Sequence, residues 1–164
     1  MSGERVRLEL PDDPRWTERA GSVVGAALRP GQTLALTGPM GAGKTTFVRG
    51  LAVGLGLDEP EEVSSPTYLL VVEHGGPVPL LHADAYLPAK LAGFLEDGGL
   101  EYLLDPAKVV CVEWAERVRN DIPDNALWVG LDHLAGGGRC LQLWCDRPGE
   151  FSWLADFPTM LGSE

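Results

Sequence analysis

The chain has little of several residue types and patterns that would define its class. Only three of its 164 residues are cysteines (Cys111, Cys140 and Cys145), and no CxxC pair occurs. This count indicates reduced thiols and argues against a disulfide framework or a cysteine metal site. No apolar run approaches the about 18 residues of a membrane-spanning helix. The N-terminal "MSGERVRLELPDD" lacks the apolar core of a signal peptide. We therefore expect a cytoplasmic protein with no membrane segment.

Positive charge is also scarce, because 13 Lys and Arg residues face 24 Asp and Glu residues, a formal net charge of −11. An acidic surface repels a phosphate backbone, so strong direct nucleic-acid binding by this chain alone is disfavoured. A mononucleotide at a locally positive site, or a basic protein partner, remains compatible with this charge. The 45% apolar and 23% charged residues are typical of a globular protein, and the length fits one domain.

The hydrophobic pattern predicts strands that alternate with helices. The strand patterns cover residues 5–10, 32–38, 67–76, 78–86, 108–113, 126–134 and 139–146, the last two as a hairpin. The helical patterns cover residues 12–28, 43–56, 88–104 with a glycine break, and 114–120. This order predicts an α/β fold, a P-loop NTPase-like three-layer sandwich with a mixed, partly parallel central sheet. We expect a single domain over residues 1–164, with the weakly patterned residues 147–164 as a peripheral C-terminal tail.

The segment "GPMGAGKT" matches the pattern GxxxxGK[ST] and lies between a predicted strand and a predicted helix. Glycines permit backbone angles that turn successive N–H groups toward phosphates, and the start of the helix favours the same anion. Lys44 is expected to reach the β- and γ-phosphates, and the Thr45 hydroxyl to ligate Mg²⁺. The alternative is a glycine-rich turn that binds nothing. The expected nucleotide contacts are Gly38, Met40, Gly41, Ala42, Gly43, Lys44, Thr45 and Thr46.

Two acids end strand patterns and are candidates for a second Mg²⁺ anchor. Glu113 ends "KVVCVE" and Asp84 ends "PLLHAD". The uninterrupted apolar run before Glu113 predicts a central strand beside the one that leads into the glycine-rich loop. We therefore favour Glu113 as the metal carboxylate and Asp84 as the water-positioning or general-base group. The alternative for each is a solvated acid just past a strand end.

Four further side chains keep two or more interpretations. In "SSPTY", Ser65 or Thr67 could contact the γ-phosphate, or the segment could be only a turn that leads into the next strand. His82 lies two residues before Asp84 and so on the same strand face, either at the site or in the core. Trp114 could shield the nucleotide, belong to a partner surface or fill the core.

Together the blocks "GPMGAGKTT", "SSPTY", "HADAY" and "VEWAE" resemble the TsaE (YjeE) family of small bacterial P-loop ATPases over roughly residues 5–146. The resemblance implies that the chain binds ATP and Mg²⁺ and hydrolyses ATP slowly. It implies a role in forming threonylcarbamoyladenosine (t6A) at position 37 of tRNAs that read codons beginning with adenine. The implied partners are TsaD and TsaB, which transfer the threonylcarbamoyl group, while TsaC makes the activated intermediate.

The resemblance also assigns roles to single residues. Lys44 and Thr45 match the family's phosphate-loop lysine and metal-binding threonine. Glu113 matches its metal-binding glutamate, Asp84 its essential aspartate and Trp114 the tryptophan beside that glutamate. Lys44, Asp84 and Glu113 are the implied catalytic residues.

Two weaker matches and two departures complete the comparison with the family pattern. Thr17 resembles a threonine near the adenine, and Arg139 a late basic residue that approaches the nucleotide. Leu87 stands where the family has an arginine, and Ala115 where it has a proline. The role of that arginine is therefore in doubt here.

Three alternative functions remain for a P-loop protein of this size. A small kinase of a nucleoside or metabolite usually has an arginine-rich lid. No such cluster is formed by the arginines that follow the loop helix, Arg117, Arg119, Arg139 and Arg147. A GTPase needs an NKxD motif, which is absent. The third alternative is a nucleotide-gated interaction module with negligible turnover.

Overall fold

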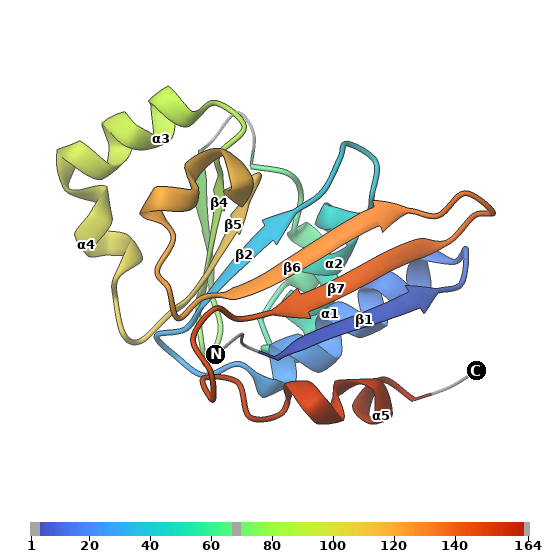
Figure 1. The fold of residues 1–164 in the computed structure, drawn as a ribbon. Helices are drawn as coiled ribbons and strands as arrows, with labels where there is room; N and C mark the ends of the chain where they lie inside the picture. The colour runs from blue at the N-terminus through green and yellow to red at the C-terminus, as the bar shows by residue number, and fades with distance from the viewer. Residues whose placement is uncertain (1–3, 67–69, 163–164) are drawn as a thin grey trace.

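The computed structural model describes residues 4–66 and 70–162, which form one seven-stranded sheet in the order β1-β7-β6-β2-β5-β4-β3 (Figure 1). The pairs β6–β2, β2–β5 and β5–β4 are parallel, and the pairs β1–β7, β7–β6 and β4–β3 are antiparallel. The predicted mixed sheet is therefore confirmed, as is the C-terminal hairpin. The strands are β1 Arg5–Leu10, β2 Thr33–Thr37, β3 Val71–His74, β4 Leu80–Asp84, β5 Val109–Glu113, β6 Leu127–His133 and β7 Arg139–Trp144.

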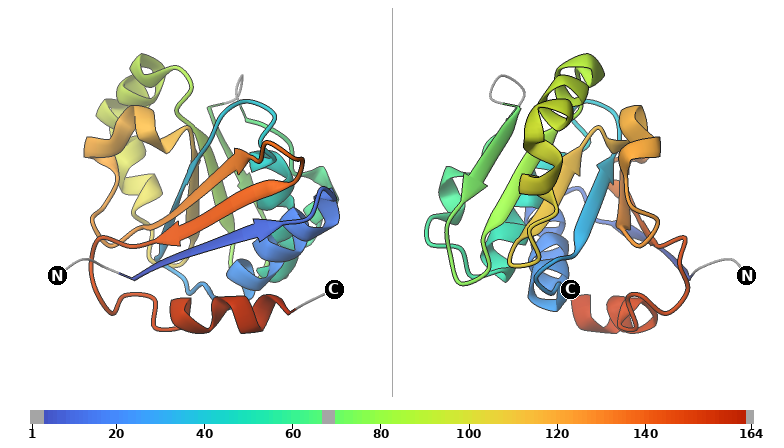
Figure 2. Two further views of the ribbon diagram at one scale, coloured as in Figure 1. Left: turned by 45° about the vertical axis from the view of Figure 1, so that its right-hand side comes forward. Right: turned by 90° about the vertical axis from the view of Figure 1, so that its left-hand side faces the viewer.

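Helices cover both faces of the sheet, which makes the three predicted layers (Figures 1 and 2). One face carries α1 (Pro14–Ala27) and α2 (Lys44–Gly54), and the other carries α3 (Pro88–Phe94) and α4 (Leu100–Leu103). A π-helical turn at Leu95–Gly99 separates α3 from α4, at the glycine break that the sequence predicts. No helix in the described ranges is long and apolar enough to span a membrane. The remaining short helices are η1 Pro60–Glu62, η3 Ala115–Asp121, η4 Leu154–Asp156 and α5 Phe157–Leu161.

The buried strand β5 lies between β2 and β4, as its apolar sequence predicts. In the register of the sheet, Glu113 is opposite Leu36 of β2 on one side and opposite Asp84 of β4 on the other. Because the three strands are parallel, their carboxyl ends meet at one edge of the sheet. The glycine-rich loop that follows β2 therefore begins beside both candidate acids.

Two apolar clusters fill the space between the layers. The first lies between the sheet and the α1–α2 layer and includes Phe47 and Leu51 of α2. The second lies on the α3 face and includes Leu81, Val112 and Trp128. Neighbouring residues of β5 alternate between the clusters, since successive side chains of a strand point to opposite faces. The three cysteines are buried and unpaired, as their count predicts.

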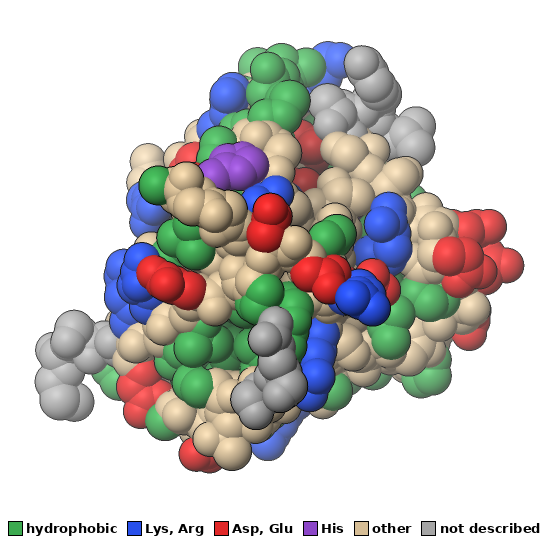
Figure 3. Space-filling model, turned by 90° about the vertical axis from the view of Figure 1, so that its right-hand side faces the viewer, with side chains coloured by type: hydrophobic (Ala, Val, Ile, Leu, Met, Phe, Trp, Pro, Cys, Tyr) green, Lys and Arg blue, Asp and Glu red, His purple; other side chains and the backbone are tan. Residues whose placement is uncertain are grey.

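The C-terminal segment contributes to the first cluster. Phe151, Leu154, Phe157 and Leu161 are buried there, and α5 packs against α1. The sequence pattern did not predict this, because helical turns of three to five residues are too short to display a helical period. A shallow depression of about 460 Å³ between β1 and α5 is lined partly by Leu8, Trp16 and Leu161. Figure 3 shows apolar side chains gathered in the lower centre of this face, with acidic and basic side chains interspersed around them.

Helices α1 and α2 cross at unusually short range. Gly21 and Gly25 of α1 face Gly50 and Gly54 of α2. A Cβ atom at any of the four would overlap a backbone carbonyl oxygen of the facing helix. Both helices thus carry a GxxxG motif, which is visible in the sequence as Gly21–Gly25 and Gly50–Gly54. The glycine crossing, meaning these four residues, fixes α1 against the helix that follows the loop.

Candidate functional site

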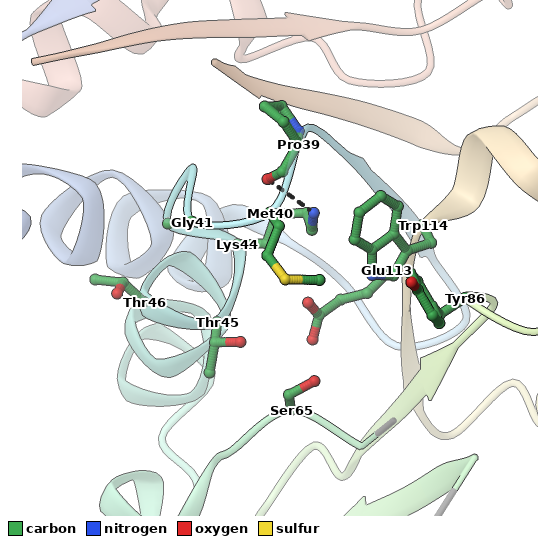
Figure 4. Close-up of a pocket in the computed structure, with 11 residues that line it drawn as sticks. Pro39, Met40, Gly41, Lys44, Thr45, Thr46, Ser65, Tyr86, Glu113 and Trp114 are labelled. Atoms are coloured by element: carbon green, nitrogen blue, oxygen red, sulfur yellow. Dashed lines mark hydrogen bonds between the residues drawn. The ribbon is translucent and has the colours of Figure 1, made fainter. Parts of the chain in front are cut away.

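A cavity of about 660 Å³ lies beyond the carboxyl ends of β2 and β5, at the start of α2 (Figure 4). It gathers nine of the residues that the sequence analysis named: Met40, Gly41, Gly43, Lys44, Thr45, Thr46, Ser65, Glu113 and Trp114. Pro39 and Tyr86 complete its lining. Gly38 and Ala42 belong to the loop but do not line the cavity, and the Ala42 side chain is buried in the first apolar cluster. Thr67 lies outside the described residues.

The loop ends at Gly43, which caps the N-terminus of α2 with φ of 103°. This left-handed conformation is accessible to glycine and strained for residues with a Cβ atom. The first N–H groups of a helix have no partner within the helix, and the dipole places partial positive charge there. The start of α2 is therefore suited to an anion in the cavity.

Lys44 is the first residue of α2, and its side chain is buried. Its ammonium donates hydrogen bonds to the carbonyls of Gly38 and Pro39, the latter at 3.2 Å. The same Nζ lies 3.6 Å from the ring centroid of Trp114, a cation–π contact. Burial lowers the pKa of Lys44, while the nearby Glu113 carboxylate opposes that shift. The cation is thus held in a poorly solvated site, where a charge interacts more strongly than in water.

Glu113 reaches the cavity from the end of β5 and is only 2% exposed. Its carboxylate points toward the side of the cavity formed by Thr45 and Ser65 (Figure 4). One carboxylate oxygen, Oε2, lies 2.5 Å from Nε2 of His82. His82 is fully buried and does not line the cavity. Of the two interpretations that the sequence left open for His82, the structure places it in the core, in contact with the site.

Asp84 is buried on β4 beside Glu113 and does not line the cavity. Its Oδ1 accepts a hydrogen bond of 2.7 Å from the backbone N–H of Tyr86, two residues further on. This local bond fixes the turn that follows β4. Asp84 therefore helps to position Tyr86, which lines the cavity. The sequence pattern gave Tyr86 no role.

An aromatic wall, formed by Trp114 and Tyr86, closes one side of the cavity. Trp114 has a left-handed backbone (φ 58°), and its ring meets that of Tyr86 edge-on with centroids 5.2 Å apart. The Arg117 guanidinium carbon lies 4.6 Å from the Tyr86 centroid and 5.1 Å from that of Trp114. Arg117 also donates a 2.8 Å hydrogen bond to the Tyr86 carbonyl. The guanidinium of Arg117 therefore lies beside Tyr86. It supplies a cation there although the next residue is Leu87, where the family pattern has an arginine.

A smaller pocket of about 140 Å³ adjoins the other side of the loop and is lined in part by Thr17, Gly43, Thr46 and Arg139. Thr17 is buried on α1, and its Cγ2 lies close to the position that a Cβ atom at Gly43 would take. The structure thus brings together Thr17, which the resemblance implies lies near the adenine, and Arg139, which it implies approaches the nucleotide. The pocket and the main cavity share Gly41, Gly43 and Thr46.

The side-chain chemistry of the cavity fits Mg²⁺ carried by phosphates. No group of three or more His, Cys, Asp or Glu side chains in the described part of the chain is arranged to hold a metal ion alone. The hard oxygen donors that line the cavity include the Thr45 hydroxyl and the Glu113 carboxylate. Mg²⁺ in phosphate-transfer sites is typically bound by one or two protein oxygens together with phosphates and water.

Arg139 should contribute to the stability of the loop. Its Nε donates to the Ala42 carbonyl at 3.0 Å and its Nη1 to the Gly138 carbonyl at 2.9 Å. We expect Arg139→Ala to lower the free energy of unfolding by about 1.5–3 kcal/mol, the range for hydrogen bonds to a charged group. Arg147→Ala, which removes an exposed pair with Asp124, is the control and should cost less than about 1 kcal/mol. Urea unfolding measures both, and equal losses would contradict a special role for Arg139.

Comparison with known proteins identifies relatives over most of the chain. The family model described as "Threonylcarbamoyl adenosine biosynthesis protein TsaE" matches residues 12–140. A tRNA threonylcarbamoyladenosine biosynthesis protein TsaE from Treponema pallidum is 41% identical over 82% of this chain and 94% of its own length. The TsaE protein of Bacillus subtilis is 36% identical over 71% of this chain and 72% of its own length. The crystal structure of Bacillus subtilis YdiB has the same fold, with a TM-score of 0.74, 24% identity and 95% of each chain covered.

Proposed function

Because the chain belongs to the TsaE family of threonylcarbamoyl adenosine biosynthesis proteins, we propose that it serves the t6A modification of tRNA as a slow Mg²⁺-dependent ATPase. The modification is formed at position 37 of tRNAs that read codons beginning with adenine. The observation that carries the proposal is the single cavity in which the Lys44 ammonium, the Thr45 hydroxyl and the Glu113 carboxylate meet at the start of α2.

Each part of the cavity has a proposed task toward ATP. The loop and the start of α2 bind the phosphate chain, and Lys44 neutralises charge on its β- and γ-phosphates. Thr45 and Glu113 would hold Mg²⁺, which neutralises charge on the phosphates when bound. Asp84 orients the attacking water, directly or through the residues that it positions. Thr17 and Arg139 line the smaller pocket and would contact the adenosine part.

The proposed partners are the TsaB and TsaD proteins. The chain would act on them without strong direct binding to tRNA. The formal net charge of −11 supports this proposal, because an acidic surface repels the phosphate backbone of a nucleic acid. Slow turnover suits a protein whose bound nucleotide controls a larger assembly.

Reconstitution tests the proposed function. Purified TsaB, TsaD and TsaC are incubated with substrate tRNA, threonine, bicarbonate and ATP, with and without this chain, and modified adenosine is quantified by mass spectrometry. We expect repeated turnovers only when the chain is present, and none with the Lys44→Ala variant. Equal multiple-turnover yield without the chain would refute the pathway role. Transfer of phosphate from ATP to a small-molecule acceptor would instead support a kinase.

Glu113→Ala tests the metal assignment. We expect the variant to lose about tenfold or more of the ATP affinity that Mg²⁺ adds, because one of the two proposed protein ligands is gone. ATP affinity in EDTA should change little. Isothermal titration calorimetry in Mg²⁺ and in EDTA separates the two quantities. Glu96→Ala, on the exposed turn after α3, is the matched control and should behave like the unchanged chain. An unaltered Mg²⁺ increment in Glu113→Ala would remove Glu113 from the site.

A further inference from the structure

His82 has an environment that restricts what its imidazole can do. Its strand, β4, pairs with Val72 of β3 on one side and Cys111 of β5 on the other at this position. The side chain is fully buried, so water does not compete for its ring nitrogens. The ring of His74 lies beside it, with centroids 6.4 Å apart. The imidazole is therefore shielded from water, and among the described residues its polar contact is with Glu113.

The two ring nitrogens differ in what they can bond. Nε2 lies 2.5 Å from Oε2 of Glu113, whereas Nδ1 is buried and has no hydrogen-bond partner among the described residues. A neutral imidazole has one N–H donor and one acceptor nitrogen. A proton on Nδ1 would leave a buried donor unpaired and would turn the lone pair of Nε2 toward a carboxylate oxygen. The contacts therefore favour the tautomer that is protonated on Nε2, with Nε2–H donating to Glu113.

This hydrogen bond has a consequence for the cavity. A glutamate side chain has several rotatable bonds, and fixing them costs conformational entropy when a ligand binds. The hydrogen bond from the buried His82 is made to Oε2 of Glu113 from within the core. The Glu113 carboxylate itself points into the cavity (Figure 4). Glu113 therefore has its orientation fixed before any cation binds.

We propose that His82 is a positioning residue for the divalent cation of the ATP site. The Nε2–H group of His82 donates to Oε2 of Glu113 and so leaves the other carboxylate oxygen available to Mg²⁺. This inference rests on the proposed function, because it assumes that Glu113 is a Mg²⁺ ligand. Buried partners that orient a metal ligand typically change metal affinity 10–100-fold when they are removed.

The binding test compares His82→Leu, which keeps the apolar volume but has no donor, with His82→Gln, whose side-chain amide can still donate. ATP affinity is measured by calorimetry in Mg²⁺ and in EDTA. We expect His82→Leu to lose about tenfold of the Mg²⁺ increment and to retain its affinity in EDTA. His82→Gln should recover most of that loss. In a Glu113→Ala background, His82→Leu should cause no further loss, because the two residues act through one contact.

The outcomes separate this inference from the proposed function. If Glu113→Ala removes the Mg²⁺ increment but His82→Leu leaves it intact, the positioning role is wrong and the metal assignment stands. If Glu113→Ala also leaves the increment intact, the metal assignment itself fails. A loss in His82→Leu that persists undiminished in the Glu113→Ala background would show a general structural effect and overturn the proposal.

A measurement on the unaltered, ligand-free chain tests the tautomer directly and does not depend on how a variant folds. Long-range ¹H–¹⁵N correlation spectra distinguish protonated from unprotonated imidazole nitrogens. We expect the His82 Nε2 resonance at a protonated position and Nδ1 at an unprotonated one. An Nε2 without a proton would overturn the proposal, since that nitrogen could not donate to Glu113.

Discussion

Lys44→Ala should abolish measurable ATP binding and turnover, the largest functional effect that the structure predicts. The Lys44 ammonium lies at the start of α2, is almost wholly shielded from water and has Glu113 close enough to affect its pKa. Its loss leaves that carboxylate facing the triphosphate without the neighbouring cation. Removal of one preorganised charge-stabilising group typically lowers turnover about 10²–10³-fold.

Calorimetry with ATP and Mg²⁺ and a phosphate-release assay measure this effect. Lys90→Ala is the matched control, because Lys90 is an exposed lysine of α3 outside the cavity lining. It should bind and hydrolyse ATP like the unchanged chain. Circular dichroism should show that both variants remain folded. Full ATPase activity in Lys44→Ala would exclude this cavity as the nucleotide site.

The second large effect concerns stability, and it comes from the glycine crossing. A methyl group at Gly50 would overlap the backbone of Glu18 on α1, and backbone cannot rotate away as a flexible side chain can. We expect Gly50→Ala to lower the free energy of unfolding by about 3 kcal/mol or more, at the upper end of overpacking costs. ATP affinity should fall as well, since α1 carries Thr17 against the loop residue Gly43.

Gly93→Ala provides an informative control for that prediction. Gly93 also lies within a helix, α3, but a Cβ atom there would meet nothing within 4 Å. Alanine is the better helix former, so this variant should gain about 0.5–1 kcal/mol. Urea unfolding of the two variants should thus give changes of opposite sign. Stabilisation by Gly50→Ala would mean that the helices are further apart than the crossing requires.

Much of the fold and the candidate site was predictable because local patterns carry it. The apolar run that ends at Glu113 predicts a buried central strand, and that strand does lie beside β2. The glycine pattern before Lys44 predicts a loop between a strand and a helix, and α2 does begin at Lys44. His82 and Asp84 are two residues apart in a strand pattern, and this spacing predicts that their side chains lie on the same face of the sheet. In each case the hydrophobic period or the turn residues of one short segment are sufficient to predict its structure.

Other features were not predictable because they depend on contacts between distant segments. Arg117 meets Tyr86 across 31 positions of the chain, and no spacing rule links the two. The burial of Phe157 follows from the space left beside α1, which the weak pattern of the tail does not encode. The segment 114–120, predicted as a helix, forms the 3₁₀ helix η3 after the left-handed Trp114. The ring of Trp114 forms part of the cavity wall. These tertiary contacts override the helix propensity of the segment.

The row formed by Leu36, Glu113 and Asp84 across three parallel strands makes the length of β5 more important than its composition. Exchanges between apolar side chains of similar volume within the strand usually cost less than about 1.5 kcal/mol. Insertion or deletion of one residue would instead exchange the two faces of everything beyond it. Val112 would then point toward the face of the sheet that Glu113 now occupies, and Glu113 would point into the second apolar cluster, although no residue of the cavity had been replaced. Among variants of this protein, the amino acids of β5 should therefore vary, but its number of residues should stay the same.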